Sequence, residues 1–346
     1  MSELRQDPTT REWVIMAPER SRRPQQTLKK VSTEILSEWD ESCPFCPGNE
    51  AQTPEAVLTL SGSGGNTEWD IRVVPNMFAA LTMDKNNIPL SQGLLTRGMP
   101  GLGVHEVIIE NPSHNTTIAM MSYDQVENLL ATYQQRYNTL KNDPQLKSIT
   151  IFKNNGRESG TSLSHPHSQL IATPIITPYY HRRFDVAVDY YSDTGNCIYC
   201  DILKEELKNE ERVVTETEDF VVFHPYASHS SYETWIIPRK HDSSFGLFPK
   251  EHRGGLAVLL KDNLLCLYRG LNNPAYNMMI NTSVTKDEEN PYFHWHIRIV
   301  PRLSMIAGFE MGSGIYINSV LPEDSVRFIR DTARSLPDTE CTSLKQ

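Results

Sequence analysis

The chain has 346 residues, of which 38% are hydrophobic and 22% are charged, and its formal net charge is −10. This length and composition fit two globular domains of ordinary size, and the acidic balance argues against binding to a nucleic-acid backbone. No stretch is as long and apolar as a membrane span, and the N-terminus has no apolar signal segment, so we expect a cytoplasmic protein without membrane contacts.

The first feature along the chain is a basic cluster from Arg20 to Pro24, which includes Arg23. It has the size of an element that binds phosphate on a small substrate, although a solvated charged loop would have the same composition. Cys43 and Cys46 follow in the sequence CPFCPG, whose proline and glycine suit a tight turn. Without a secretion signal, a Cys-x-x-Cys pair favours metal binding or redox chemistry over a structural disulfide.

The periodicity of the first half predicts strands and one long helix. A helix is expected from Ser122 to Leu140, because its apolar residues recur with the helical period and Ser122 with Gln125 can form a capping box. Strands are expected on both sides of this helix, at residues 69–76, 105–111, 148–154 and 168–174. The second half repeats this order, with a helix around Leu256 to Leu267 and strands at residues 219–226, 233–238, 277–283 and 296–301.

Four potential metal ligands also recur in the same order in the two halves. They are Cys43, Cys46, His114 and His165 in the first half and Cys197, Cys200, His241 and His294 in the second. Two such series at matched spacing are hard to obtain by chance, so we infer an internal duplication with domains at residues 1–178 and 179–346. Several strands and one long helix in each copy predict an α+β fold of tandem domains with mainly antiparallel sheets.

Each series would complete a Cys₂His₂ metal site. Zinc binds such sets tetrahedrally, and four protein ligands leave no position open for a substrate, so we predict structural zinc at about two ions per chain. Free thiols and surface histidines would account for one series, but they account poorly for two. Of the other cysteines, Cys266 is expected in the core, and Cys341 is expected in a polar tail without a role.

The sequence His165-Pro-His167-Ser-Gln169 holds the candidate catalytic residues. On a strand these three residues share one face, and if His165 binds metal, the imidazole of His167 stays free. A neutral imidazole is a competent nucleophile toward phosphorus, and the neutral amide of Gln169 can donate to a phosphoryl oxygen without repelling it. Residues 154–162 form a glycine-rich polar loop that offers backbone N–H groups to phosphate. Taken alone, a His-x-His strand is more often a metal or core feature than a nucleophile.

On these residues the chain resembles the galactose-1-phosphate uridylyltransferase family of the histidine-triad superfamily, over almost its whole length. The segments that carry the resemblance are residues 11–24, the Cys43-Pro-Phe-Cys46 knuckle, and residues 72–81, 105–115, 154–169 and 294–301. A His-Pro-His-x-Gln sequence with a Cys-x-x-Cys pair upstream is a specific signature. The resemblance implies two histidine-triad-like domains, of which the first is catalytic.

The resemblance further implies a ping-pong reaction on a nucleotide sugar and a hexose 1-phosphate. His167 would attack the α-phosphorus of UDP-glucose, expel glucose 1-phosphate and carry the uridylyl group, which galactose 1-phosphate would then accept to give UDP-galactose. Gln169 would bind the transferred phosphoryl group, and Ser162 would bind the second phosphate.

Other binding residues are implied in the same way. Asn76 and Asn154 match family positions near the nucleotide, and the two arginines of the basic cluster match residues near the phosphates. Family members are homodimers whose active sites borrow residues from the partner chain. The stretch around Phe309 and Glu310 is therefore expected to serve the neighbour's site.

Departures from the family pattern leave alternatives open. The best-known members have carboxylate and histidine ligands at the second metal site, where this chain offers the thiolates of Cys197 and Cys200. These cysteines and residues 308–318 also resemble the ADP-glucose phosphorylase branch, which moves adenylyl groups through the same histidine. Arg298 replaces the glutamine in the second copy, which is expected to be a non-catalytic scaffold. The alternatives are thus an ADP-glucose phosphorylase or other adenylyltransferase and, outside the enzymes, a zinc-stabilised binding module.

Overall fold

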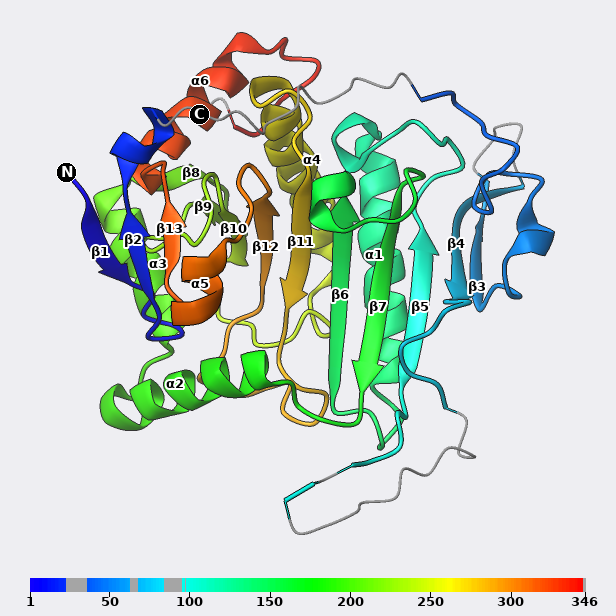
Figure 1. Cartoon of the computed structure of the whole chain (residues 1–346), viewed down its shortest axis with the longest axis horizontal. Helices are drawn as coiled ribbons and strands as arrows, with labels where there is room; N and C mark the ends of the chain where they lie inside the picture. The colour runs from blue at the N-terminus through cyan, green and yellow to red at the C-terminus, as the bar shows by residue number, and fades with distance from the viewer. Residues whose placement is uncertain (23–35, 63–67, 84–94, 97, 345–346) are drawn as a thin grey trace.

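The computed structural model describes residues 1–22, 36–62, 68–83, 95–96 and 98–344, and Figure 1 shows how their elements are arranged. A ten-stranded sheet runs through the molecule, and a three-stranded sheet lies beside it. In these described ranges, no helix is long and apolar enough to cross a membrane.

The large sheet is built from both halves of the chain. The first half contributes, in spatial order, β3 (Leu58–Ser61), β4 (Trp69–Pro75), β5 (Val104–Ile109), β7 (His167–Thr173) and β6 (Ser148–Asn155). The second half continues with β11 (Tyr276–Asn281), β12 (His296–Pro301), β10 (Thr234–Pro238), β9 (Phe220–Phe223) and β8 (Val213–Glu216). All neighbouring strands of this sheet are antiparallel. The second order is the first one reversed, as a duplicated unit joined edge to edge requires.

The two halves meet where β6 pairs with β11. Ile151 lies opposite Ile280, and Asn155 lies opposite Tyr276. The sequence predicted four of the five strands in each half, missing β3 and β8, and it left open whether the two sheets join. The pairing places β7, which begins at His167, one strand away from the boundary between the halves.

Two long helices cover one face of the sheet. α1 (Tyr123–Leu140) and α4 (Arg253–Gly270) contact each other and lie behind the strands in Figure 1. α1 begins with the predicted capping box, in which the Ser122 side chain accepts from the Gln125 N–H and the Gln125 side chain accepts from the Ser122 N–H. Apolar residues of both helices and of the inward-facing strand positions form the main core. The predicted α+β class is confirmed.

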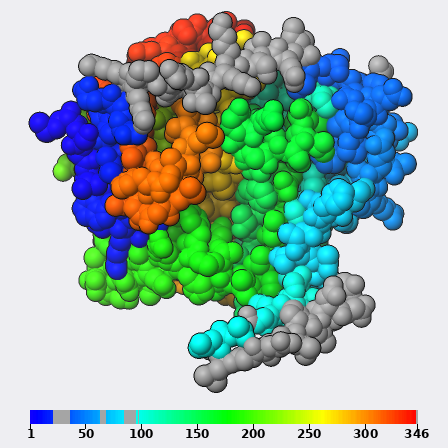
Figure 2. Space-filling model, viewed as in Figure 1, coloured from blue at the N-terminus to red at the C-terminus, as the bar shows by residue number. Residues whose placement is uncertain are grey.

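Two segments cover the ends of the opposite face of the sheet. α2 (Pro178–Thr194) and α3 (Ile198–Asn209) pack on β9 and β10 in a cluster that includes Tyr199 and Trp235. At the other end the turn with Phe45 packs on β4 and β5. The outward-facing residues of β7, β6 and β11, with Arg298 and Val300 of β12, lie between these covers and are called the trough below. α5 (Gly308–Ser313) stands in front of this face (Figure 2).

Several elements were not predicted. The sequence predicted one helix in each half, α1 and α4. The structure also contains α2, α3, α5 and α6 (Pro322–Ser335). α2 begins at Pro178, which stands in the first helical turn, where its missing N–H costs nothing. The small sheet consists of β1 (Glu3–Gln6), β2 (Trp13–Met16) and β13 (Tyr316–Asn318). Short 3₁₀ helices are η1 (Pro18–Arg22), η2 (Glu50–Gln52), η3 (Ile118–Met120), η4 (Arg157–Ser159) and η5 (Lys250–His252).

The C-terminal tail corrects one expectation. Cys341 was expected in an exposed polar tail, but it is fully buried in the main core. The cause is Asp262 of α4, whose carboxylate accepts from the backbone N–H groups of Thr342 and Ser343 at 2.9 and 2.8 Å. These bonds hold the tail against the helix. Cys266 is in the core, as predicted.

Candidate functional site

His167 is the first residue of β7 and faces the trough with a side chain that is 6% exposed. Its Nδ1 lies 2.8 Å from the carbonyl oxygen of His165. A carbonyl oxygen can only accept, so Nδ1 carries the proton and the lone pair of Nε2 is available. Within the described part of the chain, Nε2 has no hydrogen-bond partner. Burial lowers the pKa of His167 below its ordinary value. The result is a neutral imidazole held by one nitrogen and free at the other.

Gln169 lies on the same face of β7 and is held by a histidine that the sequence reasoning missed. Its Oε1 lies 2.8 Å from Nε2 of His105 on β5. Nδ1 of His105 accepts from the N–H of Ala80 at 3.1 Å, so Nε2 carries the proton and donates to Gln169. The amide nitrogen of Gln169 is thus left to donate to a ligand. Asn76 borders the same ring, with Nδ2 3.1 Å from Nε2 of His105, but both nitrogens carry hydrogen in this tautomer, so the contact is not a hydrogen bond.

Asn154 on β6 connects the site to the second half of the chain. Its Oδ1 accepts from Nδ2 of Asn277 on β11 at 2.8 Å, and Asn277 also donates to the carbonyl of Ser159 at 3.0 Å. A cavity of about 300 Å³ begins there and is lined by Asn277, Arg298 and Glu310, among others. The structure therefore places Glu310 beside the trough of its own chain, whereas the sequence had suggested a role in the neighbour's site.

The remaining predicted binding residues are less closely connected. Ser162 is exposed in the loop before β7, and Arg20 is exposed on η1. Among the described residues, no hydrogen bond or ion pair joins either of them to His167 or Gln169. Phe309 is 50% exposed on α5. Arg23 lies outside the described residues.

The four predicted ligands of the first half meet at one point. Cys43, Cys46, His114 and His165 are all buried, and one ligand atom from each lies within 4.8 Å of the others. Sγ of Cys46 is 3.4 Å from Nδ1 of His114 and 3.6 Å from Nδ1 of His165. Ligands of tetrahedral zinc are separated by about 3.6 Å at the usual bond lengths. Nε2 of His165 donates to the carbonyl of Asn111 at 2.8 Å, which turns Nδ1 toward the sulfur.

The second half repeats this geometry. Cys197, Cys200, His241 and His294 also bring four ligand atoms within 4.8 Å of one another. Sγ of Cys200 is 3.4 Å from Nδ1 of His241 and 3.6 Å from Nδ1 of His294, and Nε2 of His241 donates to the carbonyl of Asn290 at 3.1 Å. Each cluster can therefore hold a metal ion. The predicted ligands are assembled in both halves.

The clusters differ in their exposure. All four ligands of the first are buried, whereas Cys200 is half-buried and His241 is exposed in the second. Burial raises the pKa of the Cys43 thiol to about 11. A hydrogen bond with Cys200 lowers the pKa of Cys197 to about 5. Solvent reaches the second cluster more easily, so a metal ion held there would exchange faster.

The second copy of the His-x-His strand is closed to substrate. His296 corresponds to His167, and its Nδ1 lies 3.1 Å from the carbonyl of His294. Nε2, the nitrogen that is free in the first copy, contacts Nδ2 of Asn281 at 3.1 Å. The ring is fully buried and stacks on Trp235 with centroids 4.2 Å apart. A nitrogen that accepts a hydrogen bond under a helical cover cannot attack a ligand.

The strand registers also relate the partners of the two copies. Gln169 and Arg298 are equivalent, and so are His105 and Glu233. Arg298 and Glu233 form a buried ion pair, with Nε 2.7 Å from Oε1. A neutral hydrogen-bonded pair in the first copy is thus an ion pair in the second, which agrees with the expectation of a scaffold.

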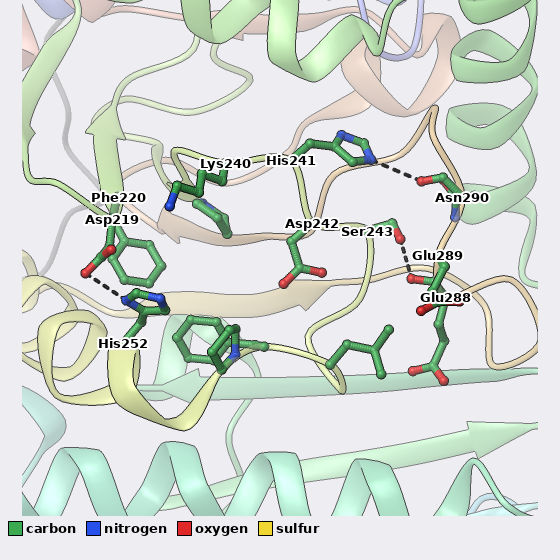
Figure 3. Close-up of a pocket in the computed structure, with 14 residues that line it drawn as sticks. Asp219, Phe220, Lys240, His241, Asp242, Ser243, His252, Glu288, Glu289 and Asn290 are labelled. Atoms are coloured by element: carbon green, nitrogen blue, oxygen red, sulfur yellow. Dashed lines mark hydrogen bonds and ion pairs between the residues drawn. The ribbon is translucent and has the colours of Figure 1, made fainter.

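A larger cavity, of about 480 Å³, lies beside the second cluster (Figure 3). Nδ1 of His252 lies 2.9 Å from a carboxylate oxygen of Asp219 on one side of it, and Asp242 points into it. Glu288 and Glu289 line the other side. The lining holds four carboxylates against one lysine, Lys240, so the trough suits a phosphorylated ligand better than this cavity does.

Family models match both halves of the chain. Residues 1–177 match the N-terminal domain of galactose-1-phosphate uridyl transferase, and residues 183–316 match its C-terminal domain. The chain belongs to the galactose-1-phosphate uridylyltransferase family. The predicted family and the predicted transferase class are confirmed.

Individual members of the galactose-1-phosphate uridylyltransferase family align along nearly the whole chain. The ADP-glucose phosphorylase of Arabidopsis thaliana is 36% identical over 335 residues, which cover 96% of this chain and 93% of that protein. The galactose-1-phosphate uridylyltransferase of Thermotoga maritima is 30% identical over 341 residues, covering 96% and 99%. The crystal structure of the Arabidopsis phosphorylase with bound ADP-glucose has a TM-score of 0.83 at 35% identity and covers 97% of this chain and 99% of that one.

Proposed function

We propose that this protein transfers a nucleotidyl group from a nucleoside diphosphate glucose through a covalent adduct on His167. The observation that carries the proposal is the fixed tautomer of His167, whose Nδ1–H is held by a carbonyl and whose Nε2 is free in the trough. The Nε2 lone pair forms a bond to the α-phosphorus, and the bond from that phosphorus to the bridging oxygen breaks. Glucose 1-phosphate leaves with the electron pair.

The second half-reaction regenerates the free imidazole of His167. An oxygen of an acceptor phosphate attacks the same phosphorus, the P–N bond breaks, and its electrons go back to Nε2. Each step exchanges a P–O bond of the nucleotide and the P–N bond of the adduct, which are similar in energy. The reaction therefore needs no external energy source. It does need the exclusion of water, which would hydrolyse the adduct, and the 6% exposure of His167 supports this requirement.

Two activities fit this chemistry. The first is the predicted UDP-glucose:hexose-1-phosphate uridylyltransferase, which the family models and the Thermotoga relative support. The second is ADP-glucose phosphorylase, with inorganic phosphate as acceptor. The identity of 36% to the phosphorylase, against 30% to the Thermotoga uridylyltransferase, and the TM-score of 0.83 to the phosphorylase structure favour ADP-glucose as the preferred donor. Uridylyl transfer remains the competing activity.

A panel of substrates tests this proposal. Purified protein is assayed with UDP-glucose, ADP-glucose and diadenosine tetraphosphate, each with galactose 1-phosphate or inorganic phosphate. We expect ADP-glucose with phosphate to give the highest kcat/KM. A preference for UDP-glucose with galactose 1-phosphate would assign the uridylyltransferase instead. If no labelled donor forms an adduct with the protein, both activities are refuted and the non-catalytic binding module is the better interpretation.

Gln169 and His105 are expected to act as one unit on the transferred phosphoryl group. A positioned amide donor is worth about a hundredfold in rate, so Gln169→Ala should slow adduct formation by about that factor. Gln169→Glu should slow it more, because it sets a carboxylate against an anionic phosphate. His105→Ala should reduce the rate in the wild type but have little further effect in Gln169→Ala, because His105 acts by orienting the amide.

Rapid-quench measurement of adduct formation on the two single alanine variants and their combination provides the check. Equal rates for wild type, Gln169→Ala and Gln169→Glu would reduce Gln169 to a strand residue. Fully additive effects of His105→Ala and Gln169→Ala would show that His105 acts elsewhere.

The two clusters are proposed to hold zinc, about two ions per chain, with four protein ligands each. Such sites have no position for a substrate, so the metal contributes fold stability and anchors the strand that begins at His167. The division of the chain into domains at residues 1–178 and 179–346 and the cytoplasmic location also remain proposals.

A homodimer is the proposed assembly. The segment around α5 exposes large apolar side chains on the trough side of the molecule, and Met305, Phe309 and Met311 are 83%, 50% and 75% exposed. A second copy of the chain would cover them and close the site from water. Light scattering on the purified protein should give twice the chain mass, and Met311→Glu should shift it toward the monomer.

A further inference from the structure

A buried polar cluster lies directly beneath the catalytic strand, on the face opposite the trough. Nζ of Lys153 is 2.7 Å from Oε2 of Glu110, and the two side chains are 1% and 0% exposed. Ser168 donates to Oε1 of Glu110, and the hydroxyl of Tyr133 contacts both Ser168 and Glu110. All of these residues lie in the first half of the chain, and none belongs to either metal cluster.

The cluster binds three consecutive residues around the nucleophile. The N–H of Glu110 donates to the carbonyl of Pro166 at 3.1 Å. Nζ of Lys153 donates to the carbonyl of His167 at 3.3 Å. The side chain of Ser168 donates to Glu110. The main-chain carbonyls of Pro166 and His167 and the side chain of Ser168 are therefore held from the face opposite the trough.

The second half of the chain shows whether the fold needs polar residues at the positions of this cluster. The registers make Pro238 equivalent to Glu110, Ile280 equivalent to Lys153, and Ile297 equivalent to Ser168. These three residues are buried and apolar. The same arrangement of strands thus forms without charges. Burying an ion pair is costly, and well-packed apolar residues often do as well or better for stability, so stability alone does not explain the cluster.

The difference follows from what each histidine does. In the second copy, His296 is held through its side chain, which stacks on Trp235 and contacts Asn281. In the first copy, Nε2 of His167 has to stay free to react, so these contacts are not available. Phe45 contacts the ring edge-on, with centroids 5.5 Å apart, and the polar contact that orients the ring is the Nδ1–H bond to the carbonyl of His165. The position of this carbonyl, and hence the rigidity of the main chain around it, takes the place of the polar contact that Asn281 makes in the second copy.

Resting on the proposed function, we infer that Glu110 and Lys153 are positioning residues for the nucleophile. They hold residues 166–168 so that Nε2 of His167 points along the line of attack on the α-phosphorus. Ser168 and Tyr133 complete the hydrogen bonds of Glu110 and keep the buried carboxylate satisfied. A displacement of about 1 Å at a reacting atom lowers a rate by about a hundredfold, which sets the expected size of the effect.

The test replaces both charges at once by the kind of residue found in the second copy. The double variant Glu110→Leu/Lys153→Met leaves no unpaired buried charge, so we expect it to fold, to keep the metal content of the wild type and to melt at a similar or higher temperature. Rapid-quench labelling with radioactive ADP-glucose, or UDP-glucose if that labels the wild type better, should be about a hundredfold slower.

A second measurement separates positioning from a general defect. In the His167→Ala background, where no adduct forms, the same double substitution should leave the dissociation constant of the donor within about twofold. A folded double variant that labels at the wild-type rate would overturn the inference. So would a loss of donor binding that equals the loss of rate, because the cluster would then act on the pocket and not through His167.

Two controls keep the outcomes distinct. Failure of wild-type protein to label with either donor would contradict the proposed function itself, independently of the cluster. If the double variant does not fold, Ser168→Ala is tested in its place. This substitution removes only one hydroxyl, at a fully buried position. A severalfold slower labelling of folded Ser168→Ala with unchanged donor binding supports the inference, and an unchanged rate overturns it.

Discussion

Replacement of His167 by alanine is expected to leave a folded, metal-loaded protein whose turnover is lower by a factor on the order of 10⁴ or more. The side chain is the proposed covalent carrier, and none of the hydrogen bonds of the metal clusters passes through its ring. Turnover with the best donor, metal content and thermal melting measured on the same preparation provide the check.

The matched control for this prediction is His296→Ala in the second copy. His296 has the same backbone contact, but its ring is buried under a helical cover, so its loss should lower stability and spare the chemistry of the remaining folded protein. Free imidazole is expected to restore part of the activity of His167→Gly by occupying the vacated space. Near-normal transfer by His167→Ala would refute the assignment of the nucleophile.

Removal of a metal ligand is expected to act on stability first. Cys43→Ser or His165→Asn should lower metal content and decrease the free energy of unfolding by about 3 kcal/mol or more, because metal binding is coupled to folding. Activity should fall as well, since His165 precedes the catalytic strand by two residues and its carbonyl holds His167. Metal analysis and denaturant unfolding of the variants measure both effects.

The second cluster provides the comparison. Cys197→Ser should also lower metal content and stability but affect the chemistry less, because its cluster lies at the other end of the trough face. A chelator should strip the half-exposed second cluster before the buried first one. Wild-type protein that retains one metal ion or none after gentle purification would contradict the proposal of two sites.

Local patterns determined much of what could be predicted. The helical period and the Ser122–Gln125 capping box defined α1, because capping and periodicity act within one element. The repeated series of cysteines and histidines revealed both clusters, because a tetrahedral metal needs the same ligand types wherever they stand in the chain. His167 and Gln169 were proposed as site residues for a similar reason, since residues two apart on a strand share a face.

Tertiary structure decided the features that depend on distant partners. Only the pairing of β5 with β7 brings His105 to Gln169, and only the pairing of β6 with β11 brings Asn277 to Asn154. Cys341 is buried because Asp262, far away in the sequence, binds the tail.

The contrast between the two histidine strands shows the same division most clearly. Both have a His-x-His sequence, and the sequence by itself identified the second as a scaffold only through Arg298. The structure shows the physical cause, which is that Asn281 occupies Nε2 of His296 and Trp235 covers the ring. Whether a histidine can react depends on its hydrogen-bond partners and its cover, and both are supplied by strands and helices that lie elsewhere in the chain.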